Sequence, residues 1–520
     1  MDTLVTDIVV VGGGTAGWLT ACRLAAAADA HASRKVSVTL VESPDVPTIG
    51  VGEGTWPTIR GTLQAIGIAE SDFLVACDAS FKQGSRFDGW RDGAASDSYY
   101  HPFNLPPAVS FDDLTAAWQA AAATVPFAEF ASVQPGLCAL DLAPRQRAMP
   151  DYAGAVNYAY HLDAAKLAAL LRDHATQTLG VRHIRDHVTG VETREDGDIA
   201  SVRTREHGDI GGQLFIDCSG HAALLIGGHC NVPFIDRGTE LFNDRALAVQ
   251  VPVTSDSPIA SFTNATAHAA GWTWDIGLPT RRGIGCVYSS SHIDDAGAEA
   301  TLAVYLNAKA PGAKLDALSP RKLSFRSGHR ERFWQRNVLA VGQSAGFLEP
   351  LEASAIVMIE LALDALVANF PRTRAVMDIQ ATRYNALFRY RWDRIVEFLK
   401  LHYVLSQRDE AYWRDHRDPA SVPQRLTDAL KVWEGQAPSD FDLGAVNEVF
   451  PAASYAYILY GMGFAAPVAG PLHAHRTDTT LDAVRQMAVR ARNLAASLPT
   501  NRAYLTALRD QNKTPEIVQG

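Results

Sequence analysis

The sequence predicts an α/β protein built on a doubly wound, dinucleotide-binding parallel sheet. An apolar strand at residues 7–11 runs directly into glycines with G-x-G-x-x-G spacing, and a second strand at 36–41 closes a βαβ unit. Two later apolar strands, at 214–217 and 338–341, end in turn residues of the same kind. Because distant segments supply one sheet, we expect a single interleaved core and not a tandem of independent domains.

Composition fits a soluble globular protein of 520 residues, with 47% hydrophobic and 20% charged residues. A formal net charge of −10 argues against a nucleic-acid partner, since phosphate binding requires a basic face. No apolar run reaches the roughly 18–20 residues that a membrane helix needs. The first residues carry Asp2 and Asp7 and lack the basic region of a secretory signal, so we expect a cytoplasmic protein.

The six cysteines are scattered and form no Cys-x-x-Cys pair. We expect free, inert thiols, as in a reducing compartment. The sixteen histidines show no His-Glu-x-x-His or similar ligand spacing, so we expect no metal site.

The first βαβ unit has each part of a dinucleotide-binding turn. Behind the strand at 7–11 come Gly12, Gly14 and Gly17, with Thr15 and Ala16 between them, and then a predicted helix over 18–28. The glycines allow a tight turn and close approach of the backbone to a pyrophosphate at the helix N-terminus. Glu42 ends the second strand and is placed to accept a ribose hydroxyl. The alternative is a purely structural glycine turn.

A second glycine-rich loop follows at 49–55 and includes Gly50, Val51, Gly52 and Glu53. A nicotinamide-dependent dehydrogenase has no need of this loop. A plain glycine-rich surface turn is the alternative.

Four segments together resemble the flavin-dependent halogenases, the enzymes typified by the tryptophan halogenases. They are the glycine turn at 12–18, Lys82 in Phe-Lys-Gln-Gly, Trp-Thr-Trp-Asp-Ile at 272–276, and Gly-Phe-Leu-Glu-Pro-Leu-Glu-Ala-Ser-Ala-Ile at 346–356. The resemblance spans essentially the whole chain. It implies an FAD-binding core like that of p-hydroxybenzoate hydroxylase, with an interleaved substrate-binding β-sheet and a helical C-terminal region.

The resemblance also divides the chain. We expect a core over 1–365, with flavin segments at about 1–75, 155–225 and 335–365, and a helical substrate-pocket region over 366–520. Further flavin contacts are expected at Val188, Gln343 and Ile356. The family often has a different polar or small residue where Gln343 stands.

Lys82 and Glu352 match the catalytic lysine and glutamate of the family. The resemblance implies that Lys82 holds hypohalous acid, as a hydrogen-bonded oxidant or as a haloamine; an amine on a flexible stem suits that task. A solvated surface lysine is the alternative. Glu352 would polarise the oxidant, stabilise the arenium cation or take its proton. Glu349 is the competing carboxylate, but the family role belongs to the second acid.

The halide is expected at the backbone of Ser354 and Ala355. The common Ser-Thr-Gly of the family reads Ala353-Ser354-Ala355 here. Because alanine adopts positive φ less freely than glycine, this departure leaves the halide preference open.

Aromatic residues complete the expected site. Trp272 and Trp274 alternate on a predicted strand, and in the family this pair separates the organic substrate from the flavin; the wall of a hydrophobic core is the alternative. His101, Phe103 and Tyr455 match the substrate pocket, with Tyr455 where tryptophan halogenases have a tryptophan. Stacking of rings on a flat substrate explains such a set.

The sequence therefore predicts an FADH2- and O2-dependent halogenase that brominates or chlorinates an electron-rich aromatic, an indole derivative. Since only one dinucleotide fingerprint is present, reduced flavin is expected from a separate flavin reductase. An aromatic hydroxylase of the same fold and a non-catalytic flavin-binding protein are the rival interpretations. A homodimer is left open.

Overall fold

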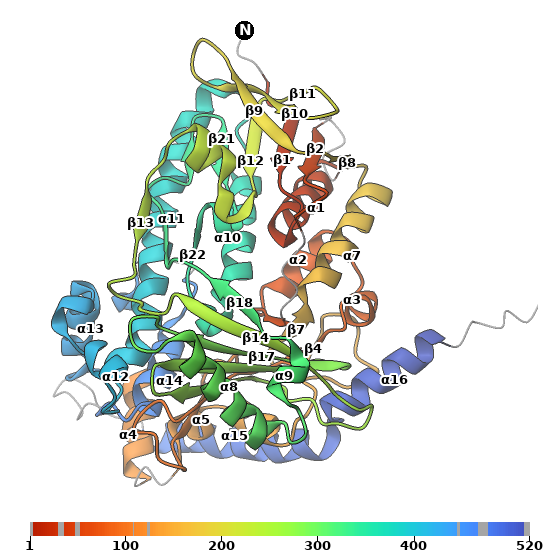
Figure 1. Cartoon of the computed structure of the whole chain (residues 1–520). Coiled ribbons are helices and arrows are strands. Elements are labelled where there is room, and N and C mark those ends of the chain that lie inside the picture. The colour runs from red at the N-terminus through yellow and green to blue at the C-terminus, as the bar shows by residue number, and fades with distance from the viewer. Residues whose placement is uncertain are drawn as a thin grey trace, which may run out of the picture.

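The computed structural model describes residues 4–29, 36–46, 52–107, 109–121, 125–444, 448–465 and 477–513. Its first layer is a six-stranded sheet with the order β20-β21-β12-β1-β2-β8 (Figure 1). All neighbours are parallel except β20 and β21. The strands are β1 (Asp7–Val11), β2 (Ser37–Glu42), β8 (Arg182–Arg185), β12 (Leu214–Asp217), β20 (Trp334–Gln335) and β21 (Val338–Ala340).

Helix α1 (Thr15–Asp29) follows β1 and packs against α7 (Ala164–Gln177) and α10 (Ser354–Ala368). Helix α1 begins three residues before the predicted start at 18, because the backbone is already helical from Thr15, within the glycine turn. The predicted strands at 7–11, 214–217 and 338–341 are confirmed to within one residue, and the second strand is shifted by one. The doubly wound core predicted from the sequence is therefore confirmed.

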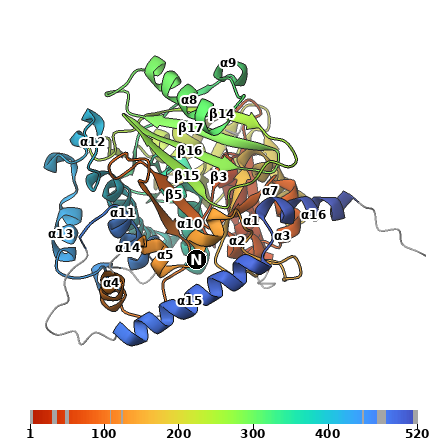
Figure 2. The same cartoon turned by 90° about the horizontal axis from the view of Figure 1, so that it is seen from below.

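A seven-stranded sheet forms the second layer, with the order β18-β14-β17-β16-β15-β5-β6. Figure 2 shows α8 (Asp295–Lys309) and α9 (Leu315–Leu318) on its outer side. Only the β15–β5 pair is parallel. The strands are β5 (Gly84–Asp88), β6 (Ser98–Pro102), β14 (Arg245–Pro252), β15 (Thr263–His268), β16 (Gly271–Gly277), β17 (Arg281–Tyr288) and β18 (Arg321–Ser324).

A small antiparallel sheet connects the two layers. Its centre is β7 (Ala159–Asp163), which pairs with β3 (Gly52–Gly54) on one side and with β4 (Ser80–Lys82) on the other. A Cβ at Gly283 of β17 would lie 3.1 Å from the backbone nitrogen of Gly52, so β3 runs in close contact with the large sheet. Strand β7 continues into α7, which packs on α1 of the first layer.

The other elements before residue 370 are short. Two more three-stranded sheets are β9 (Val188–Thr193), β10 (Ile199–Thr204) and β11 (Asp209–Gly211), and β13 (Phe234–Asp236), β19 (Gly328–Arg330) and β22 (Gly346–Phe347). The remaining helices and turns are α2 (Ile59–Ala65), α3 (Glu70–Ala76), α4 (Phe111–Ala120), α5 (Phe127–Ala131), α6 (Gln134–Ala139), η1 (Gly220–Ala222), η2 (Leu224–His229), η3 (Gly342–Ser344) and η4 (Leu351–Ala353).

The C-terminal region is helical, as predicted. Its long helix α11 (Arg374–Val404) is buried almost continuously from Ile395 to Tyr403. Helix α15 (Thr477–Ser497) runs along the base of the molecule and packs on α4 and α6 (Figure 2). The others are α12 (Ala411–Asp415), η5 (Pro419–Ser421), α13 (Gln424–Trp433), η6 (Asp440–Asp442), α14 (Ala452–Gly461) and α16 (Asn501–Lys513). The expected boundary after residue 365 falls inside α10, so the two-part division stays a prediction.

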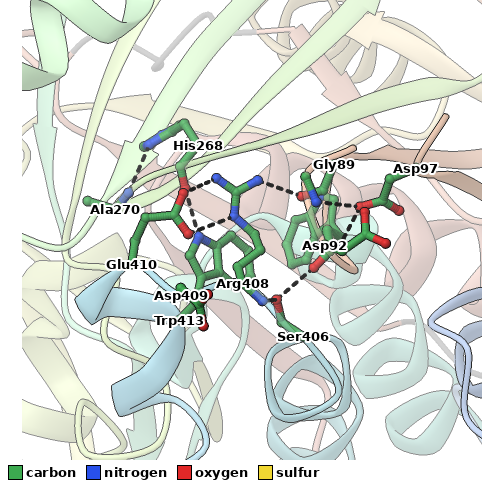
Figure 3. A network of polar contacts seen from close by, with 12 residues as sticks. Gly89, Asp92, Asp97, His268, Ala270, Ser406, Arg408, Asp409, Glu410 and Trp413 are labelled. Carbon is green, nitrogen blue, oxygen red and sulfur yellow. Dashed lines mark hydrogen bonds and ion pairs between the residues drawn. The ribbon is translucent and has the colours of Figure 1, made fainter. Parts of the chain in front are cut away.

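Arg408 joins this helical region to the loop between β5 and β6 (Figure 3). Its guanidinium donates to the Gly89 carbonyl at 2.8 Å, pairs with Glu410 and lies 5.4 Å from the Trp413 ring centroid. Asp97 closes the same loop by accepting from the backbone nitrogens of residues 92 and 93. The loop is thereby fixed just before β6, the strand that carries His101.

Within the described residues, no helix is long and apolar enough to cross a membrane, and no group of three or more His, Cys, Asp or Glu side chains is placed to hold a metal ion. The six cysteines are free, and five of them are buried. Burial raises the pKa of each thiol, so they are protonated and unreactive, as predicted.

A buried ion pair fixes the first residue of α3 to the segment before β7. Glu70 is 1% exposed and accepts hydrogen bonds from Tyr158 and Tyr160 at 2.7 and 2.6 Å. Its second oxygen accepts from the backbone of Tyr152 at 2.7 Å and pairs with buried Arg145. Removing the carboxylate would leave the guanidinium buried without its counter-charge.

We expect Glu70→Leu to lower the free energy of unfolding by about 3–5 kcal/mol, the usual cost of breaking a buried ion pair. Equilibrium chemical denaturation measures it. Asp72→Asn, on an exposed position of the same helix, is the control and should change stability by about 0.5 kcal/mol or less. Equal, small effects of both substitutions would contradict this assignment.

Candidate functional site

The glycine turn after β1 has the geometry that a dinucleotide pyrophosphate requires. Gly12 has φ +115°, and a Cβ there would lie 2.2 Å from the Cys218 carbonyl oxygen. A Cβ at Gly17 would lie 1.8 Å from the Gly12 carbonyl oxygen, so only glycine lets α1 pack this close to the strand. Nothing lies within 4 Å of a Cβ at Gly14, which leaves the backbone open to a ligand. The residues present therefore fit a dinucleotide such as FAD.

Glu42 lies beside this turn, as predicted. One of its oxygens accepts from His183 Nε2 at 2.8 Å, and the other would lie 1.6 Å from a Cβ at Gly13. A separate cavity of about 330 Å³ is lined by Glu42, Arg172, His183 and Arg185. Glu42 therefore lies next to the turn, and His183 also holds its carboxylate.

The other expected flavin residues lie at different depths. Thr15 and Ala16 open α1, and Ala16 touches Gly342 at the start of η3. Gln343 is exposed, Ile356 is buried in the first turn of α10, and Val188 begins β9. Gly50 and Val51 lie outside the described residues. Gly52 and Glu53 lie on β3, where burial and then Asp163 raise the pKa of Glu53 to about 7.

Lys82 ends β4 and is 1% exposed, so the interpretation as a surface lysine is wrong. Its Nζ would lie 3.2 Å from a Cβ at Gly54 and is 5.2 Å from the centroid of the Phe103 ring. Burial lowers the pKa of Lys82 to about 8, against the opposing effect of Glu352. The ammonium is therefore held in an apolar setting close to its point of deprotonation.

Glu352 is the carboxylate whose charge acts on Lys82. It is 4% exposed, and its Oε1 accepts from His101 Nδ1 at 2.7 Å. Burial alone would raise the pKa of Glu352, but His101, His402 and Lys82 together hold it below the ordinary value. His402 Nε2 lies 3.5 Å from the same Glu352 oxygen. The site therefore contains an ionised carboxylate and a buried amine.

The backbone at Glu352 is strained. Glu352 has φ 61° and ψ 12°, Ala353 has φ 53° and ψ 41°, and α10 begins at the next residue. Left-handed backbone at a non-glycine residue costs about 1–3 kcal/mol unless the surroundings enforce it. Ala355, which stands where the family has glycine, has ordinary helical backbone as the second residue of α10. The positive φ values fall two and three positions earlier.

Glu349 lies in a different environment from Glu352. It is fully buried, and its Oε2 accepts from Asn243, Trp272 and Tyr403 at 2.6, 2.9 and 2.7 Å. Burial raises the pKa of Glu349. This carboxylate therefore fixes the Trp272 indole, whereas Glu352 contacts the histidines near Lys82.

Trp272 and Trp274 lie on β16 with ring centroids 6.4 Å apart, and both are buried. The Trp274 ring lies over Gly285 of the neighbouring strand, where a Cβ would be 2.0 Å from the ring. The two side chains lie on one face of the strand, as the alternation predicted.

An aromatic cluster surrounds the expected substrate residues. The ring centroid of Trp56 lies 5.3 Å from that of Phe103 and 5.1 Å from that of Phe450. The Phe450 ring in turn stacks on Phe398, with centroids 3.7 Å apart. Tyr455 packs edge-on against Phe398 at 5.0 Å. The structure thus brings Phe103 and Tyr455 into one cluster.

Several residues of the site were missed from the sequence. They are Trp56, His161, Thr263, Phe398, His402, Phe450 and Ser454. Ser454 bonds His101 Nε2 at 2.9 Å, and Thr263 bonds His161 Nε2 at 2.8 Å beside Gly54. None has a distinctive local motif, apart from Ser454, which directly precedes the expected Tyr455.

Three comparisons place this site among known proteins. The family model described as "Tryptophan halogenase" matches residues 7–478. The tryptophan 6-halogenase of Streptomyces toxytricini is 35% identical, over 96% of this chain and 98% of that protein. A crystal structure of a tryptophan halogenase from Shewanella frigidimarina NCIMB 400 is 48% identical and superposes with a TM-score of 0.94, over 98% of each chain.

A flavin-dependent halogenase from Xanthomonas campestris is 30% identical with a TM-score of 0.86, over 97% of this chain and 99% of that one. These relatives match the chain over nearly its whole length. The chain therefore belongs to the tryptophan halogenase family and is a flavin-dependent halogenase.

Proposed function

We propose that the chain halogenates an electron-rich aromatic of the indole class with hypohalous acid held at Lys82. The observation that carries this proposal is the burial of Lys82 and Glu352 at one point of the fold. A Cβ at Gly54 would lie 3.2 Å from Lys82 Nζ and 3.4 Å from Ala353 Cβ, the residue after Glu352. Such a pair suits polarisation of an oxidant and removal of a proton from the ring.

FAD would be held by the turn at Gly12, Gly14 and Gly17, with Glu42 beside it and the β3 segment nearby. When bound in reduced form it would supply, with O2, the oxidising equivalent that converts halide into hypohalous acid. A separate flavin reductase would deliver that reduced flavin. Ser354 and Ala355 open the 15-residue helix α10, where free backbone N–H groups and the helix dipole favour a halide ion.

The chain's own side chains would then complete the substitution. The Lys82 ammonium gives a proton to the oxygen of the hypohalous acid, so that this oxygen leaves as water while a bond forms between the halogen and the ring carbon. The ring loses its proton to Glu352, which His101 holds in place. The aromatic cluster would hold the substrate ring by stacking, and the Trp272–Trp274 surface would keep it away from the flavin.

We expect Lys82→Met to lower the halogenation rate at least about a hundredfold, because the group that polarises the oxidant is lost. FAD affinity should stay unchanged. Product formation is measured by liquid chromatography with reduced flavin regenerated by a flavin reductase. Lys166→Met, at a partly exposed lysine of α7, is the matched control and should retain activity. Near-normal halogenation by Lys82→Met would refute the assignment.

The pH profile should show a plateau that ends near pH 8. With Lys82 acting as an ammonium and a pKa of about 8, the active fraction falls as pH rises through this value. The pKa of Glu352 is lowered, so the acidic limb should lie below the ordinary range of a glutamate. Initial rates with non-limiting reductase test this. A rate that rises through pH 8 would mean that the neutral amine acts, as in a haloamine.

Indole-like rings should be better substrates than free tryptophan, and bromide should be at least as effective as chloride. The rings that contact Tyr455 are Phe398 and Trp433, and the two charged groups that influence it most, Glu397 and Arg394, pair with each other. An unpaired zwitterion would cost several kcal/mol there, more than the ~1–3 kcal/mol gained by stacking and burial. Bromide is the more easily oxidised halide.

Competition assays with indole and L-tryptophan, in bromide and chloride separately, test this preference. Efficient chlorination of free tryptophan, with indole a poor competitor, would contradict it.

Tyr455→Ala should raise KM for indole with a smaller change in kcat, because stacking acts on substrate and transition state alike.

A further inference from the structure

Trp56 donates a hydrogen bond from its indole nitrogen to the backbone carbonyl of Glu352 at 2.7 Å, and both residues are buried. This carbonyl belongs to the residue with φ 61°, directly before Ala353 with φ 53°. Neither residue is glycine, so the left-handed conformation needs an external contact to hold it. The Trp56 indole nitrogen is such a contact, acting directly on the peptide that joins the two strained residues.

The indole itself is fixed from three sides. The centroid of its ring lies 5.3 Å from that of Phe103, 5.1 Å from that of Phe450 and 6.0 Å from that of His101. Its backbone follows Thr55, whose nitrogen and hydroxyl both donate to the Tyr160 carbonyl at 2.9 Å, and whose hydroxyl accepts from the Tyr160 nitrogen at 3.0 Å. Trp56 therefore transmits the position of strand β7 to Glu352.

The same strand fixes Lys82. Residues 80–82 pair with 161–159 of β7 on the edge opposite to the segment that leads into Trp56. The relative position of amine and carboxylate therefore depends on one path, from Lys82 through β7 and Thr55 to Trp56 and the Glu352 carbonyl. We propose that Trp56 is a positioning residue for halogenation, and that its indole N–H holds the left-handed backbone of Glu352 and Ala353 in the reactive geometry.

This inference rests on the proposed function and goes further by assigning a role to a residue outside the lysine and glutamate pair. Without the indole N–H, the strained segment relaxes and the carboxylate moves away from the ring proton. Substrate would still bind among the aromatic side chains, and the flavin turn would be unaffected. The loss should therefore appear in kcat and not in KM.

Trp56→Phe is the test, because it keeps an aromatic ring and removes only the N–H donor and part of the ring area. We expect kcat for halogenation to fall about tenfold or more, the effect of losing one buried hydrogen bond in the transition state. KM for indole and the affinity for FAD should change by about twofold or less. Thermal unfolding of each variant verifies that it is folded.

Rescue distinguishes positioning from packing. In the double variant Trp56→Phe/Ala353→Gly, residue 353 adopts positive φ without the hydrogen bond from the indole. Its kcat should therefore return most of the way to the wild-type value. Ala353→Gly alone is the reference. Phe450→Leu alters the same cluster without touching the Glu352 carbonyl, so it should raise KM without lowering kcat.

Three results would overturn the proposal. They are full activity of Trp56→Phe, a loss carried by KM or by FAD affinity, and a kcat loss that Ala353→Gly does not relieve. The wild-type arm separates this outcome from failure of the proposed function. If wild-type protein halogenates indole and the variants behave in one of these ways, only the role of Trp56 is wrong. If wild-type protein does not halogenate any aromatic, both are wrong.

Discussion

The pairing of one buried strand, β7, with two short neighbours is the constraint on which the site depends. All five residues of β7 are buried, and its two edges hold β3 and β4 in fixed register. Register matters because a slip of one residue would turn Lys82 to the opposite face. The strand also leads into α7, which packs on the dinucleotide-binding helix α1. The flavin turn, the amine and the segment leading to Trp56 are therefore joined through one strand and the helix that follows it.

Electrostatics then separate the roles of two similar glutamates. Both are buried, yet Glu349 accepts three neutral donors and its pKa is raised, whereas Glu352 lies near His101, His402 and Lys82 and its pKa is lowered. A buried carboxylate stays ionised only where such partners offset its lost hydration. Glu352 is thus available as a base, and Glu349 orients Trp272. The backbone is strained at Glu352 and not at Glu349. Strained backbone is common at active sites, where the surrounding structure holds a reactive geometry in spite of its conformational free-energy cost.

Sequence patterns could predict the parts of this structure that are local. The strand, glycine turn and helix at residues 7–29 follow from periodicity and spacing, and Lys82 and Glu352 from short motifs in a family resemblance. The contacts that complete the site join residues far apart in the chain. Trp56 and Glu352 are separated by 296 positions, and His101 and Ser454 by 353. Such pairs leave no periodic signal, and only packing brings them together.

The backbone at the start of α10 has the same dependence. The motif shows that alanine stands at 355 where the family has glycine, but the conformation at this position depends on where the helix begins, which is at Ser354. Likewise, the alternation of Trp272 and Trp274 predicted a shared face, whereas the bond from Trp272 to Glu349 requires the fold of the whole 346–356 segment.

The most direct test of the account is the dependence of product identity on halide. Purified protein would be given FAD, a flavin reductase, NADH, O2 and indole, with and without bromide, and the products identified by mass spectrometry. We expect monobrominated indole to form only when bromide and the reductase are both present. Formation of hydroxylated indole independently of halide would show that the substrate reaches the flavin directly, and would contradict the roles assigned to Lys82, Glu352 and the tryptophan pair.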